Sequence, residues 1–184
     1  DEVRRDRVAL AREAEEARCE EGRNKEGCEE DRNKEMSTQD LTGREVRTTR
    51  LIGAARERVF RAWTDPEQLA RWWGPKGFTN TFHRFELKPE GVWDFTMHGP
   101  NAMDFNNTCV FKRIETPSYL EFDHLKEMHF YKAIVLFTAV PQGTLVEWTM
   151  RFDTAEELTP IKTFIERANE ENMDKLEQLL NEQP

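Results

Sequence analysis

The sequence predicts an α+β fold in which a curved, seven-stranded antiparallel sheet wraps round one long C-terminal helix. Three observations carry this prediction. An amphipathic pattern closes the chain, from Thr159 to about Leu180. Six strand-like runs with turn residues between them precede it, and two short helical patterns separate these runs from a first strand. Helices segregated from runs of strands in the order β-α-α-β6-α are typical of α+β domains with antiparallel sheets.

Composition narrows the class of protein. A chain of 184 residues accommodates one domain with an appendage, or at most two small domains. Its net charge of −9 argues against nucleic acid as a partner. No apolar run approaches the roughly 20 residues that span a bilayer, so membrane insertion is not expected. Three cysteines without tight spacing predict no disulfide framework, and we expect a cytoplasmic protein.

Residues 1–40 differ from the rest of the chain. They contain 14 acidic and 9 basic residues and no aromatic residue. Such a segment buries too little apolar area to offset its ordering entropy, so we expect a flexible segment or an exposed helix. The folded domain is expected over residues 41–184. Met36 resembles an ordinary protein start, and we interpret residues 1–35 as an addition ahead of it.

The first strand is predicted at residues 44–52, where β-branched residues alternate in part. A short helix follows over residues 54–63. Asp65 is then expected to cap a second helix, because Pro66 fits the first helical position and Gln68 stands three residues after the cap.

The central part of the chain alternates strand-like runs with turn residues. Pro117-Ser118 and the segment 141–143 indicate two of the hairpins. The runs predict strands at residues 78–88, 92–98, 105–114, 119–125, 130–140 and 145–152.

The last helix is expected to begin with Thr159 as N-cap and Pro160 at the first helical position. Its apolar residues recur at three- and four-residue steps, which is typical of an amphipathic helix. Asn172 interrupts this stripe. The apolar residues of the stripe are Ile161, Phe164, Ile165, Ala168, Met173, Leu176, Leu179 and Leu180.

Aromatic residues of the strands are expected to face this helix. They fill the interior as ordinary core, or a bent sheet and one helix leave an apolar cavity between them that binds a small molecule. On the second interpretation the candidate ligand-binding residues are Trp72, Trp73, Phe78, His83, Phe85, Trp93, Phe95, Met97, Phe111, Tyr131, Phe137, Trp148, Met150, Phe164, Ala168 and Asn172.

Two polar residues are the candidates for chemistry in such a cavity. His83 falls on the same face of its predicted strand as Phe85, so we expect the histidine to point inward. There it could act as an acid, a base or a donor that orients a ligand. The alternative is a histidine satisfied by a strand neighbour. Asn172 either faces the cavity or lies at its boundary with water. His83 is the best catalytic candidate, although no nucleophile motif accompanies it.

No metal or other cofactor is expected. The possible metal ligands are spread over different predicted strands and turns, without the tight paired spacing of zinc sites. These residues are His98, His124, His129 and Cys109.

Three sequence runs resemble a known superfamily. They are Ala62-Trp-Thr-Asp-Pro-Glu67, the segment 69–79 and Trp93-Asp-Phe-Thr-Met-His-Gly-Pro100. Together they resemble the START-like, SRPBCC superfamily, in the branch of small bacterial homologues of the activator of the heat-shock-protein-90 ATPase. The similarity covers roughly residues 44–181 and implies a helix-grip fold with a cavity between sheet and helix. Relatives usually have Gly-Gly at Glu90-Gly91 and Asp-Gly at Asn101-Ala102.

The resemblance leaves three functions open, because one fold hosts many activities. The first is binding of a small hydrophobic or aromatic ligand in the cavity. The second is an enzyme similar to polyketide cyclases and aromatases. The third is an interaction module similar to the co-chaperone branch, with a protein partner that the sequence does not name.

Overall fold

The computed structural model describes residues 43–125 and 129–182, so the predictions for residues 1–40 lie outside the described residues. The described residues belong to one compact unit that starts at Gly43. Its element order is the predicted one with one short helix added. The elements are β1 (Glu45–Ile52), α3 (Arg56–Thr64), α4 (Pro66–Trp72), β2 (Thr79–Phe85), β3 (Val92–His98), β4 (Asp104–Glu115), β5 (Tyr119–Leu125), β6 (Phe130–Val140), β7 (Gly143–Phe152), α5 (Ala155–Leu158) and α6 (Lys162–Glu182).

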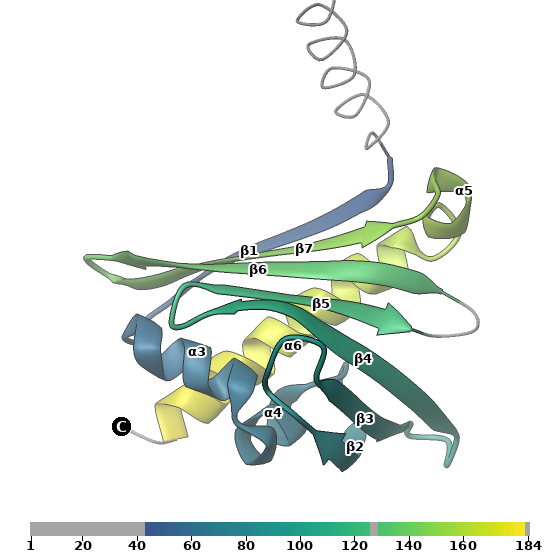
Figure 1. Cartoon of the computed structure of the whole chain (residues 1–184), viewed down its shortest axis with the longest axis horizontal. Helices are drawn as coiled ribbons and strands as arrows, with labels where there is room; N and C mark the ends of the chain where they lie inside the picture. The colour runs from purple at the N-terminus through teal and green to yellow at the C-terminus, as the bar shows by residue number, and fades with distance from the viewer. Residues whose placement is uncertain (1–42, 126–128, 183–184) are drawn as a thin grey trace, which may run out of the picture. The chain divides into compact units, whose positions relative to one another are not determined.

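All seven strands form a single sheet in the order β1-β7-β6-β5-β4-β3-β2, and every neighbouring pair is antiparallel (Figure 1). Strands β2 to β7 form a meander, and β1 joins it by pairing with β7 along its whole length. Both edges of the sheet, β1 and β2, therefore come from the first half of the domain.

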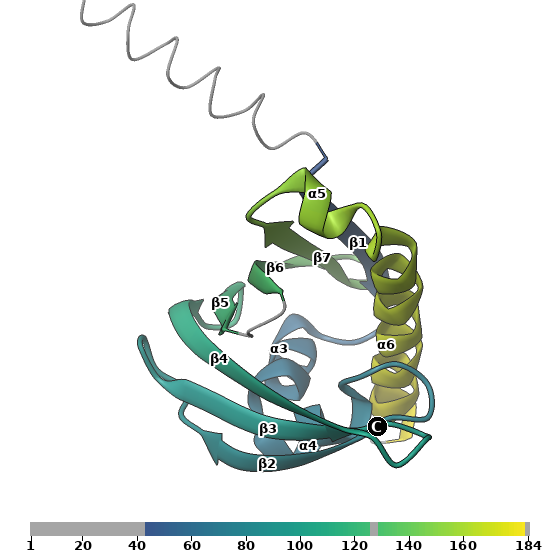
Figure 2. The same cartoon turned by 90° about the vertical axis from the view of Figure 1, so that its right-hand side faces the viewer.

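The sheet curls round α6, which closes its concave side (Figure 2). Helices α3 and α4 contact the C-terminal part of α6, and α4 also contacts β2. Met173 and Leu176 of α6 have no exposed surface. The predicted helix-grip architecture is therefore confirmed.

The start of α4 is formed as its sequence predicts. The Asp65 carboxylate accepts hydrogen bonds from the backbone N–H groups of Glu67 and Gln68, at 3.0 and 3.3 Å. Pro66, which has no N–H to satisfy, occupies the first helical position. Leu69 and Trp72 are buried on the inner side of this helix.

The predicted start of the last helix is wrong. Thr159 ends the short helix α5 instead, and its hydroxyl donates to the Ala155 carbonyl at 2.7 Å. Helix α6 begins at Lys162, beyond Pro160. Thr154, not Thr159, is an N-cap, and its hydroxyl accepts from the Glu157 N–H. The Thr-Pro pair therefore joins two helices.

Two residues other than glycine have a left-handed backbone in the turns between strands. Glu90 lies in the connection between β2 and β3 and has φ 59°. Ala102 lies in the connection between β3 and β4 and has φ 54°. The adjacent Gly91 has no room for a side chain, because a Cβ there would lie 2.0 Å from the Glu86 carbonyl oxygen. The β2–β3 turn therefore has glycine at the position without room for a side chain, and the backbone of the neighbouring Glu90 is strained.

Candidate functional site

A cavity of about 270 Å³ lies between the sheet and the N-terminal half of α6. Four parts of the fold supply its walls: the segment 73–78 after α4, strands β3 to β5, strands β6 and β7, and α6. The lining residues are Trp73, Gly74, Pro75, Phe78, Phe95, Met97, Phe105, Asn107, His124, Tyr131, Trp148, Met150, Phe164, Ile165, Ala168, Asn169 and Asn172.

The segment after α4 forms one wall because two contacts tie it to α6. The Lys175 ammonium donates to the Gly74 carbonyl at 3.0 Å, and the Lys76 N–H donates to the Glu171 carboxylate at 2.9 Å. Burial lowers the pKa of Lys175, while Glu171 acts in the opposite direction. Trp73 on this wall packs against Trp148 of β7, with ring centroids 5.4 Å apart.

Ten of the predicted ligand-binding residues line this cavity. Phe164 lies at its edge, with 53% of its surface exposed, so the expectation that Phe164 is buried is wrong. The ten are Trp73, Phe78, Phe95, Met97, Tyr131, Trp148, Met150, Phe164, Ala168 and Asn172.

Five other predicted residues form the packed core beside the cavity. Trp93 stacks on Phe95 at 4.5 Å, and Phe85 contacts Phe111 at 5.4 Å. Their rings fill the space between strands, so the ordinary-core interpretation applies to them. These five are Trp72, Phe85, Trp93, Phe111 and Phe137.

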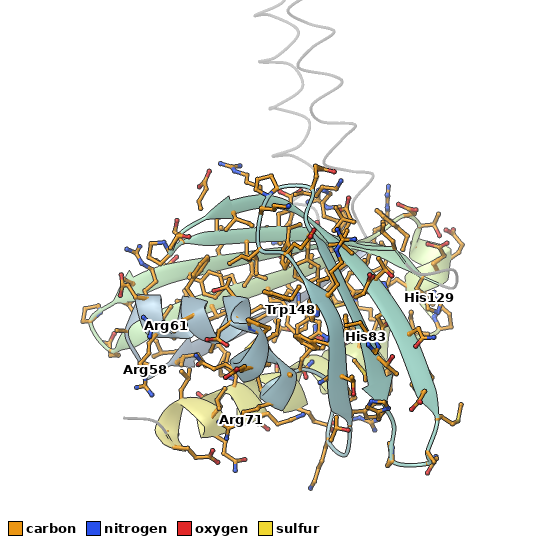
Figure 3. The ribbon with its side chains drawn as sticks, turned by 60° about the horizontal axis from the view of Figure 1, so that its bottom comes forward. Arg58, Arg61, Arg71, His83, His129 and Trp148 are labelled. Atoms are coloured by element: carbon orange, nitrogen blue, oxygen red, sulfur yellow. The ribbon has the colours of Figure 1, made fainter. Side chains whose placement is uncertain are left out.

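The prediction that His83 faces the interior is also wrong. The register of β2 against β3 shifts between Phe82 and Arg84, so Phe82 and Phe85 both pack against the core and His83 is exposed. A β-bulge reverses side-chain alternation in this way. The His83 Nε2 atom instead pairs with the Thr96 hydroxyl at 2.8 Å. Figure 3 labels His83 on the β2–β3 side, and Trp148 near the middle of the domain.

Seven lining residues were absent from the prediction. Three of them carry polar side chains at inward positions. Asn107 lies on the same face of β4 as Cys109, and His124 lies on the same face of β5 as Phe122. Asn169 lies on the buried face of α6. Strand alternation and helical spacing do place these three residues on inward positions. They were not predicted because polar side chains are usually exposed. The seven are Gly74, Pro75, Phe105, Asn107, His124, Ile165 and Asn169.

A histidine and a tyrosine stack at the sheet side of the cavity. The rings of His124 and Tyr131 are nearly parallel, 4.6 Å apart. The His124 Nδ1 atom lies 3.3 Å from the His129 carbonyl oxygen, and Nε2 lies 3.1 Å from the Asn107 Oδ1 atom. Asn107 Nδ2 donates to the Phe105 carbonyl at 2.7 Å, which fixes its amide orientation. Both ring nitrogens of His124 are therefore engaged within the protein.

Tyr131 contributes a phenolic hydroxyl to this end of the cavity. Burial raises the pKa of Tyr131 well above its ordinary 10, with a smaller contribution from Cys109. The hydroxyl therefore stays a neutral donor. Within residues 43–125 and 129–182 it makes no hydrogen bond, and it is not among the fully enclosed unpaired atoms.

Helix α6 contributes two carboxamides to the opposite wall. Asn169 donates to the Thr48 hydroxyl at 3.2 Å and contacts the Met150 sulfur. Asn172 Oδ1 and the Trp148 indole N–H are buried without a partner in the described part of the chain. Buried polar groups are normally paired, and these two unpaired atoms belong to residues that line the cavity.

The chemistry of the lining is almost entirely neutral. Among the described residues that line the cavity there is no Lys, Arg, Asp or Glu. No group of three potential metal ligands occurs within the described ranges. None of the helices described is both long and apolar enough to cross a membrane.

A curved antiparallel sheet that grips a C-terminal helix beside an apolar cavity is a helix-grip fold, and the family match of this chain makes it a member of the START-like, SRPBCC superfamily. A model of the family described as activator of Hsp90 ATPase homolog 1-like protein matches residues 53–181. The chain belongs to this family. A search of curated proteins found no match.

Solved structures share the fold over most of their length. A crystal structure of a protein from Nitrosomonas europaea is 18% identical, with a TM-score of 0.71, and the match covers 78% of this chain and 97% of that one. A solution structure from Arthrobacter aurescens is 25% identical, with a TM-score of 0.72 and coverages of 78% and 89%. An AHSA1-like protein from Aeromonas hydrophila is 25% identical, with a TM-score of 0.62 and coverages of 74% and 92%.

Proposed function

We propose that this protein binds a small hydrophobic or aromatic molecule in the cavity between the sheet and α6. The observation that carries the proposal is an apolar space of about 270 Å³ whose walls include unpaired polar atoms. Small-molecule sites generally combine an apolar lining with a few placed polar groups.

Blocking the cavity tests this proposal. Ala168 lines the cavity from α6 and is 8% exposed, so Ala168→Phe places a ring in the space that a ligand needs. We expect the wild type to bind an apolar probe such as naphthalene, seen as saturable quenching of tryptophan fluorescence, because Trp73 and Trp148 line the cavity. In Ala168→Phe the affinity should fall at least about tenfold, since the probe loses its apolar contacts.

The matched control is Ala139→Phe, which makes the same change at an exposed position of β6. It should bind the probe as the wild type does. Equal quenching in all three proteins would contradict the proposal, because the probe would then lie elsewhere.

Two alternatives lack a specific observation in their favour among the described residues. An enzyme similar to cyclases or aromatases was expected to use His83, but that histidine lies outside the cavity. An interaction module similar to the co-chaperone branch requires a surface patch with a known partner. Ligand binding is therefore the function that the geometry supports best.

A further inference from the structure

We propose that the ligand of this cavity carries an acceptor oxygen, such as a ketone or quinone carbonyl, which accepts a hydrogen bond from Tyr131 beside His124. This inference rests on the proposed function and specifies its ligand class. On this proposal the cavity has two parts: a hydrogen-bond donor end on β5 and β6, and an apolar part that extends toward Trp73 and Met97.

The donor end is set by Tyr131. Its hydroxyl has no partner in the described part of the chain, although the residue lines the cavity. An unmet donor in an apolar space is costly, and a ligand oxygen offsets that cost by accepting its proton. Because the pKa of Tyr131 is raised well above 10, the hydroxyl remains a donor throughout the physiological range.

His124 lies beside Tyr131 at the same end of the cavity, with its ring parallel to the Tyr131 ring and the two centroids 4.6 Å apart. Its two ring nitrogens are already engaged with the His129 carbonyl oxygen and the Asn107 amide oxygen. The ligand oxygen is therefore met by the Tyr131 hydroxyl rather than by the imidazole.

The same lining disfavours cationic ligands. No carboxylate lines the cavity within the described residues, so an ammonium group entering it would lose its water without gaining a counter-ion. The cavity therefore discriminates among aromatic molecules of similar size by the polarity of one substituent.

Three naphthalene probes of similar size test this discrimination: naphthalene, 2-acetylnaphthalene and 2-naphthylmethylammonium. We expect the ketone to bind the wild type about tenfold more tightly than naphthalene, and the ammonium probe to give no saturable quenching. Tyr131→Phe removes one hydroxyl from the cavity. In this variant the ketone should bind no more tightly than naphthalene does.

Tyr119→Phe is the matched control. The Tyr119 hydroxyl donates to the Glu121 carboxylate at 2.7 Å and Tyr119 does not line the cavity, so all three affinities should stay as in the wild type. If naphthalene binds and the ketone gains nothing from Tyr131, the acceptor-oxygen inference is overturned while ligand binding stands. If no probe binds the wild type, the proposed function itself fails.

Discussion

At Ala102 and Glu90 the backbone adopts a conformation that their side chains disfavour. Left-handed backbone costs an L-residue roughly 1–2 kcal/mol relative to glycine, because Cβ crowds the following carbonyl group. Ala102 lies in the β3–β4 turn, where its N–H donates to the Gly99 carbonyl at 3.2 Å. The surrounding turn, rather than the residue, therefore determines φ at this position.

Ala102→Gly should raise the free energy of unfolding by about 0.5–1 kcal/mol, because relief of the strained φ exceeds the entropy that glycine adds to the unfolded chain. Urea denaturation measures this change. Ala139→Gly is the control: residue 139 lies in regular β6, where glycine should lower stability by roughly 0.5–1 kcal/mol. A loss of stability in both variants would mean that the turn gains nothing from glycine.

At the scale of elements, the sequence predicts each strand, but not the irregularity of β2. Alternation from Phe85 predicted an inward His83, and one bulge between Phe82 and Arg84 reverses it. The bulge depends on pairing with β3, which no local pattern encodes. The cavity was foreseeable from the aromatic strands and α6, whereas its polar end was not. Asn107 and His124 fall on inward positions, but their burial depends on partners from other strands.

The edge strand β1 is joined to α6 by an arginine. Arg50 forms ion pairs with Glu170, Asp174 and Glu177, which lie on one face of the helix. The Arg50 side chain is 23% exposed, so these pairs are only partly screened by solvent. The hydrogen bond that Arg50 donates to the Glu170 carboxylate is the largest cause of a raised pKa for Arg50.

Arg50→Met should lower stability by about 1 kcal/mol at pH 7, because three carboxylates then face one another without a cation. A raised arginine pKa gives stability that is fully present below the pKa of the unfolded chain, so the arginine itself does not titrate near neutral pH. Arg47→Met is the control, since Arg47 is 72% exposed and, in the described part of the chain, forms its ion pair with Glu45. Equal losses in both variants would show that the three ion pairs of Arg50 contribute no more than one exposed pair.

For the whole molecule, the boundary of the folding unit differs from the boundary of the family match. The match begins at residue 53, yet β1 ends at Ile52 and pairs with β7 along eight residues. Val46 and Ile52 of β1 are each 1% exposed. Burying two such side chains contributes roughly 3–6 kcal/mol, a large share of the 5–15 kcal/mol that stabilises a typical domain. The strand is therefore part of the core.

Two truncated chains test where the unit begins. The chain 43–184 retains β1 and should melt within about 2 °C of the full chain, because every described core residue lies within it. The chain 53–184 lacks β1 and should melt at least about 10 °C lower or lose its cooperative transition. It also leaves β7 as an open edge and Glu170, Asp174 and Glu177 without Arg50. If removal of residues 1–42 alone lowered the midpoint by a similar amount, that segment would be a structural part of the domain.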